Sequence, residues 1–189
     1  MNFANKISTM RILSVPFLIA CLIYYSIERD YLRFVALGIF TLGVISDAVD
    51  GYIARKSQQK SKAGLVLDPL GDKLLLLSAF ICLYLVKDFP AHIKFPLWVV
   101  LIVISRDVII MLGAIVIFIV KQEISVLPTR WGKLTTTFQM SSVISVLLQL
   151  KLSYIFWNIA AVFTVISGID YVRKGFKVLY GVDNHNHNR

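Results

Sequence analysis

Four aspartates recur at helical spacing between residues 47 and 72. The stretch reads Asp47-x-x-Asp50-Gly51-x-x-Ala54-Arg55, then eight residues, then Gly64-x-x-x-Asp68-x-x-x-Asp72. The spacing within each half follows one face of a helix, so two facing helices would bring the carboxylates together. Carboxylates gathered at low dielectric repel one another strongly. Hard divalent cations that prefer oxygen ligands, Mg²⁺ or Mn²⁺, relieve that repulsion, and the pattern therefore predicts a metal site.

The surroundings of these aspartates also favour function. They lie between two strongly apolar segments, where charge is costly and by default marks a functional site. Gly51 and Gly64 leave room for a ligand near the helix backbone. One structural alternative remains open for Asp68, because Asp68-Pro69 has the form of a helix N-cap followed by proline at the first helical position.

The composition predicts an integral membrane protein. The chain has 189 residues, of which 57% are hydrophobic, and its mean hydropathy is +0.73. A spanning helix needs about 20 apolar residues. We therefore expect an all-α membrane bundle of six transmembrane helices, at about 11–27, 34–54, 72–87, 96–120, 134–150 and 153–172. A short interfacial amphipathic helix in residues 1–10 is expected to precede them. Residues 1–182 would form one domain, and 183–189 a disordered polar tail.

The net charge of +9 is explained by membrane topology and does not require a nucleic-acid partner. One side of the membrane would carry Lys6, Arg11, Arg55, Lys56, Lys60, Lys62, Lys121, Arg130, Lys133, Arg173, Lys174, Lys177 and Arg189, and the other only Arg29, Arg33, Lys87, Lys94 and Lys151. This asymmetry follows the positive-inside rule. Both termini and the acidic cluster are therefore expected on the cytoplasmic side, in a bacterial cytoplasmic membrane.

The acidic stretch closely resembles the signature of the CDP-alcohol phosphotransferase family, D-x2-D-G-x2-A-R-x8-G-x3-D-x3-D. All eight fixed positions match at every spacing. The resemblance implies an enzyme of phospholipid synthesis that displaces CMP from a CDP-linked donor, usually CDP-diacylglycerol, with an alcohol hydroxyl. It also implies a homodimer.

The resemblance further implies roles for individual residues. Asp47, Asp50 and Asp68 would be metal ligands, and Asp72 the general base that takes the proton of the acceptor hydroxyl. Asp72 is also a candidate metal ligand. The residues implied to lie near the CDP group are Gly51, Ala54, Arg55 and Gly64.

Outside the signature, the chain resembles the family branch that makes phosphatidylglycerol phosphate. Two segments carry this likeness: Asn2-Phe3-Ala4-Asn5-Lys6-Ile7-Ser8-x-x-Arg11…Pro16, and Trp131-Gly132-Lys133-Leu134-Thr135-Thr136-x-x-Gln139. The first implies that Asn5 and Ser8 lie near the nucleotide. The acceptor would be glycerol 3-phosphate, whose phosphate needs cations, and Lys133 is the best candidate.

Some alternatives remain open on the acceptor side. Arg106 is a second candidate for the acceptor phosphate, although the neighbouring Asp107 could instead be its structural partner. Inositol phosphate, serine or phosphatidylglycerol could replace glycerol 3-phosphate as acceptor. A cation channel is the remote alternative from another class of function. Clustering of the carboxylates at one end of the spans, with Arg55 among them, argues against it.

Overall fold

The computed structural model describes the backbone of residues 3–57, 64–90, 93–121 and 130–180. It describes the side chains of residues 10–46, 71, 73–90, 93–113, 115, 116, 119 and 131–176. Within these ranges the chain contains helices and no strand, which confirms the all-α prediction. The elements are α1 (Phe3–Ile23), the 3₁₀ helix η1 (Ile27–Arg29), α2 (Tyr31–Ser57), α3 (Gly64–Leu85), α4 (Leu97–Lys121), α5 (Arg130–Leu147) and α6 (Ser153–Tyr180).

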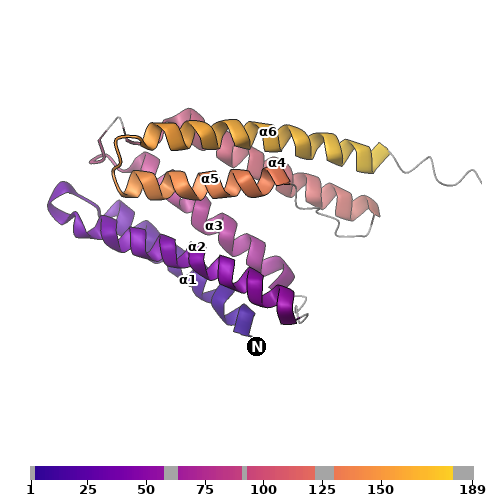
Figure 1. Ribbon diagram of the computed structural model, residues 1–189, viewed down its shortest axis with the longest axis horizontal. Coiled ribbons are helices and arrows are strands. Elements are labelled where there is room, and N and C mark those ends of the chain that lie inside the picture. Colours follow the sequence, from indigo (N-terminus) through magenta and orange to yellow (C-terminus); the bar gives the residue numbers. More distant parts are fainter. Residues whose placement is uncertain (1–2, 58–63, 91–92, 122–129, 181–189) are drawn as a thin grey trace, which may run out of the picture.

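The α-helices run back and forth along one long axis (Figure 1). α1 packs against α2 and α3, whereas α6 packs against α4 and α5. Contacts of α3 with α4 and α5, and of α2 with α5, join these two groups. The end of α2 and the beginnings of α1 and α3 consequently lie together in the lower middle of Figure 1, and α5 begins above them, at a similar position along the long axis.

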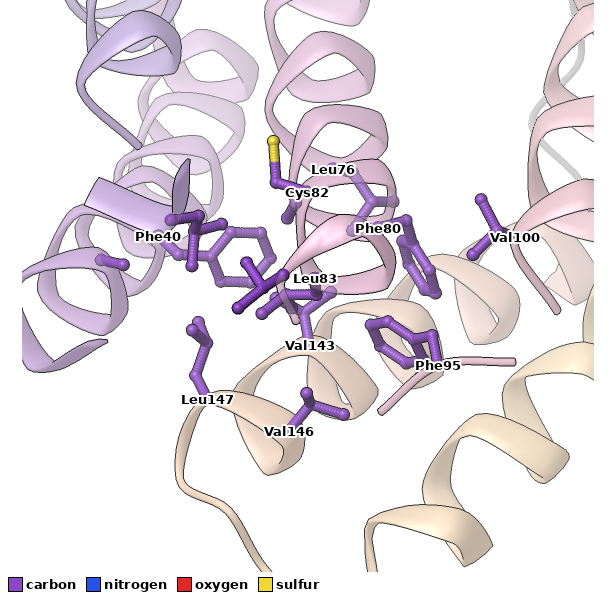
Figure 2. Close-up of a cluster of buried hydrophobic side chains, with 14 of the residues drawn as sticks. Phe40, Leu76, Phe80, Cys82, Leu83, Phe95, Val100, Val143, Val146 and Leu147 are labelled. Atoms are coloured by element: carbon purple, nitrogen blue, oxygen red, sulfur yellow. The ribbon is translucent and has the colours of Figure 1, made fainter. Parts of the chain in front are cut away.

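The two groups of helices share one apolar core. Figure 2 shows Phe40 of α2 and Leu83 of α3 beside Val143 and Leu147 of α5. All four side chains are at most 1% exposed. Burying side chains of this size from three separate helices excludes water from the middle of the bundle and fixes how the helices pack.

The predicted separate interfacial helix is wrong. Residues from Phe3 to Ile23 form one continuous helix with Pro16 inside it. A proline disturbs a helix locally, by removing its own N–H and crowding the carbonyl four residues earlier. No proline or glycine occurs between residues 3 and 15, so nothing in that segment breaks the helix before the apolar run begins.

Hydrogen bonds from Arg33 to Asp30 and Leu147, here called the arginine clip, hold the end of the bundle opposite the acidic stretch. Arg33, near the start of α2, binds the Asp30 carboxylate at 2.7 Å through both Nε and Nη2. Its Nη1 donates to the carbonyl oxygen of Leu147, the last residue of α5, at 2.9 Å. These hydrogen bonds from Arg33 hold the pKa of Asp30 below its usual value. The clip therefore joins the start of α2 to the end of α5 and satisfies a terminal helix carbonyl.

Membrane-spanning character is clearest in α6. Its segment Ser153–Phe176 has 24 residues and a mean hydropathy of 1.6, and it alone among the described residues is long and apolar enough to cross a bilayer. Shorter apolar stretches occur at Met10–Ile23, Tyr31–Ser46 and Lys73–Leu85. Large apolar side chains are also exposed on several helices, including Phe17, Leu42, Leu101 and Val162. Exposed apolar surface on many helices is typical of a protein that contacts lipid.

Candidate active site

The acidic signature divides between two helix ends that meet at one end of the bundle. Asp47 and Asp50 lie in the last turns of α2, and Asp68 and Asp72 lie in the first turns of α3. The two helices contact each other, and their signature-bearing ends are neighbours in Figure 1. The structure thus places both halves of the motif on helices, as their spacing predicts. The side chains of the four aspartates lie outside the described ones.

The other predicted nucleotide contacts belong to the same end of the bundle. α2 carries three of them and α3 one, whereas α1 carries two in its first turns. They are Gly51, Ala54, Arg55, Gly64, Asn5 and Ser8. Their side chains also lie outside the described ones, so their assignment to the nucleotide stays a prediction.

A glycine brings α2 and α3 close together beside the acidic stretch. A Cβ atom on Gly43 would collide with Leu75 Cδ2 of α3. Gly43 lies four residues before Asp47, and Leu75 lies three residues after Asp72, so this contact is about one helical turn from each. A contact between the two helices next to the signature is what they need if their carboxylates are to share one ion.

The N-cap alternative for Asp68 is wrong. α3 begins at Gly64, so Asp68 and Pro69 lie inside the helix. An N-cap residue stands just outside the first helical residue and has non-helical backbone angles. The helix start is set upstream, and capping therefore does not account for Asp68.

A buried cation on α1 faces the α2–α3 contact. Arg11 is only 4% exposed and lines a cavity of about 10 Å³ together with Gly43, Leu75 and Met140. The sequence contained a signal for this residue, since Arg11 belongs to the N-terminal segment that resembles the phosphatidylglycerol phosphate branch. The sequence predicted its side of the membrane and its place in this segment, but assigned it no role in the site.

Lys133 is the cation predicted from the sequence to bind the acceptor phosphate. It occupies the first turn of α5, which begins at the same end of the bundle as the signature, and its side chain is exposed. The polar residues that follow it are engaged within the protein. The Thr135 hydroxyl lies 2.9 Å from the carbonyl oxygens of Trp131 in α5 and Phe163 in α6, and it can donate to either. Gln139 donates to Thr164 of α6 at 3.0 Å. The contacts with Phe163 and Thr164 hold α5 against α6.

Arg106 and Asp107 belong to a buried polar network, here called the Asp107 network, with Lys73 and Ser167. Asp107 Oδ1 accepts from Lys73 Nζ at 2.5 Å and from Arg106 Nη1 at 2.8 Å. Arg106 Nη2 donates to Ser167 Oγ of α6 at 2.8 Å. These contacts favour the structural alternative for Arg106. The ion pair between α3 and α4 was not predicted, because nothing in the sequence relates Lys73 to a residue 34 positions away.

The chain is similar to known proteins over almost its whole length. Residues 1–166 match the CDP-alcohol phosphatidyltransferase family. The chain is 30% identical to the CDP-diacylglycerol–glycerol-3-phosphate 3-phosphatidyltransferase of Aquifex aeolicus, over 95% of this chain and 99% of that protein. It is 31% identical to the protein of the same name from Bacillus subtilis, over 94% of this chain and 97% of the relative. It is 30% identical to a probable phosphatidylglycerophosphate synthase of Mycobacterium tuberculosis, over 96% and 85%.

A helical bundle that carries an acidic signature on two adjoining helix ends defines a class of lipid-synthesising transferases. The chain belongs to the CDP-alcohol phosphatidyltransferase family and is an enzyme. Members of this membrane-associated family use CDP-alcohol donors and alcohol acceptors, and they generally depend on a divalent metal ion.

Proposed function

We propose that this enzyme transfers the phosphatidyl group of CDP-diacylglycerol to glycerol 3-phosphate. The products are CMP and phosphatidylglycerol phosphate. The names of relatives that match almost the whole chain support this acceptor. The observation that carries the proposal is the close approach of α2 and α3 at Gly43 and Leu75, within about one helical turn of both halves of an intact signature.

The proposed reaction is a substitution at phosphorus. The acceptor hydroxyl oxygen forms a bond to the phosphorus that carries diacylglycerol, and the bond from that phosphorus to the CMP oxygen breaks. Asp72 takes the hydroxyl proton as general base. CMP leaves with the electron pair of the broken bond.

The donor set fits a hard divalent cation. Asp47, Asp50 and Asp68 are the proposed ligands, with Asp72 as a further candidate, and carboxylate oxygens are the ligands that Mg²⁺ and Mn²⁺ prefer. The bound metal would neutralise the carboxylates and polarise phosphate oxygens. Arg55 offers a planar fork suited to a phosphate of the donor. The small residues Gly51, Ala54 and Gly64 leave space for the nucleotide, with Asn5 and Ser8 as polar contacts from α1.

The acceptor phosphate is proposed to bind Lys133. An exposed ammonium in the first turn of α5 can meet a water-soluble substrate that arrives at this end of the bundle. Arg106 is buried and bonded to Asp107 and Ser167, so we assign it to support of the site and not to direct contact with the acceptor.

All six α-helices are proposed to cross the bacterial cytoplasmic membrane, with both termini and the acidic cluster on the cytoplasmic side. The lengths of α1, α2, α3, α4 and α6 support this, at 21, 27, 22, 25 and 28 residues. At about 1.5 Å per residue these helices match a hydrocarbon core about 30 Å thick. The family resemblance also supports a homodimer.

A panel of acceptors tests the proposed function. Purified protein would be given CDP-diacylglycerol and Mn²⁺ with glycerol 3-phosphate, inositol phosphate, inositol, serine or phosphatidylglycerol, and CMP release would be measured. We expect glycerol 3-phosphate to give the fastest release. Faster release with another acceptor would replace glycerol 3-phosphate in the proposal, and no acceptor-dependent release would contradict the enzymatic reaction.

Lys133→Ala is expected to raise KM for glycerol 3-phosphate about tenfold or more with a smaller change in kcat. The reason is that a charge-assisted contact to the phosphate contributes about 1.5–3 kcal/mol, and about 1.4 kcal/mol corresponds to a factor of ten. Steady-state kinetics at varied acceptor concentration measure this. Lys151→Ala is the matched control, because Lys151 is exposed between α5 and α6 at the other end of the bundle. An unchanged KM in Lys133→Ala would move acceptor binding to another residue.

A further inference from the structure

The Asp107 network lies between three helices and is largely buried. Its members come from α3 (Lys73), α4 (Arg106 and Asp107) and α6 (Ser167). The side chains of Arg106 and Asp107 are 8% and 5% exposed, whereas that of Lys73 is 36% exposed. Burial at this depth means that water screens the charges of the network only weakly.

Both cations of the network donate to the same oxygen atom. Asp107 Oδ1 accepts from Lys73 and from Arg106, while Asp107 Oδ2 has no hydrogen-bond partner within the described part of the chain. Asp107 therefore contributes one negative charge against the positive charges of Lys73 and Arg106. Neutralising Asp107 would raise the net charge of the network by one unit, and neutralising Lys73 would lower it by one unit.

Lys73, which carries one of these positive charges, is adjacent in sequence to the acidic signature. Lys73 directly follows Asp72 in α3, so their Cα atoms are about 3.8 Å apart. Asp68 lies about one turn further toward the start of the same helix. Positive charge so near a set of carboxylates opposes a divalent cation there, and every added unit charge opposes it more strongly.

We infer that Asp107 is a positioning residue that holds Lys73 and Arg106 and, by balancing their charge, sets the divalent-metal affinity of the acidic site. The inference rests on the proposed metal site. It assigns Asp107 no contact with substrate. Its distinctive consequence is that metal affinity follows the net charge of the network.

The test measures Mn²⁺ affinity of the full-length protein in detergent by electron paramagnetic resonance, a readout that needs no turnover. Asp107→Asn is expected to weaken Mn²⁺ binding about tenfold, because one uncompensated charge is added at short range. Lys73→Met is expected to tighten binding severalfold. The double variant Lys73→Met/Asp107→Asn keeps the wild-type net charge and is expected to return to near the wild-type affinity.

Ser167→Ala is the matched control, since it removes a hydrogen bond from Arg106 without changing charge. It is expected to leave Mn²⁺ affinity within about twofold of wild type. If Asp107→Asn does not fold, Lys73→Met still tests the inference. Its expected effect on Mn²⁺ affinity has the opposite sign, and the Lys73 side chain is partly exposed.

Three results would overturn the inference, and they are distinguishable. Unchanged affinity in Asp107→Asn and Lys73→Met, with normal binding by wild type, would overturn the inference alone. A double variant as weak as Asp107→Asn would show that Asp107 acts only through packing. Absence of Mn²⁺ binding by folded wild-type protein would overturn the proposed metal site, and the inference with it.

Discussion

Replacing Asp72 by asparagine is expected to lower the rate of CMP release by at least about 100-fold while the protein remains folded in detergent. A positioned general base contributes about 10²–10⁴-fold to a rate. Asparagine keeps the shape of the side chain but cannot accept a proton from the acceptor hydroxyl. The measurement is single-turnover CMP release at saturating CDP-diacylglycerol and acceptor, so that weaker substrate binding does not imitate a chemical defect.

Asp88→Asn is the matched control for this variant. It makes the same chemical change in an exposed residue beyond the end of α3 that is distant from the signature. We expect it to retain wild-type turnover and the same thermal unfolding midpoint. Wild-type turnover in Asp72→Asn would remove Asp72 as the base, whereas loss of its thermal transition would point to misfolding.

Removal of divalent metal is expected to abolish activity. In excess EDTA, CMP release should fall to background, and Mg²⁺ or Mn²⁺ added beyond the chelator should restore it. The physical reason is that a group of carboxylates alone repels the diphosphate of the donor, and a hard cation held by those carboxylates reverses the sign of that interaction. Titration of each metal into protein freed of metal measures the concentration for half-maximal rate.

A second readout separates metal binding from chemistry. Because a ligand that binds only the folded state stabilises it, Mn²⁺ should raise the thermal unfolding midpoint of wild-type protein. It should raise that of Asp50→Asn less, because one proposed ligand is lost. Full activity in chelator would contradict metal-dependent catalysis, and an equal midpoint shift in both proteins would remove Asp50 from the ligand set.

The helices themselves were largely predictable. The span expected at 34–54 covers most of α2 (Tyr31–Ser57). The span expected at 96–120 covers nearly all of α4 (Leu97–Lys121). Long apolar segments and helical spacing are local features of the sequence, so they predict a helix whatever tertiary contacts it later makes. The prediction of a separate helix before α1 was wrong, and so was the alternative that Asp68 caps the start of α3. In both places the helix extends beyond the residue at which a local signal suggested that it begins.

The contacts between helices were not predictable. Arg106 followed by Asp107 suggested an ion pair, yet the sequence did not show that the same carboxylate also holds Lys73. It likewise did not show that the side chain of Leu75 on α3 packs against Gly43 on α2. Both depend on how helices rotate and slide against one another, which the packing of the shared core decides.

The amino-acid sequence by itself determined the reaction class and the two helices that carry the aspartates, because residue spacing along a helix is a property of the chain alone. Only the tertiary structure decided which cations pair with which carboxylate, and which residues of α2 and α3 contact each other beside the signature. Those features join residues that are distant in sequence, and they exist only when six helices have packed into one bundle.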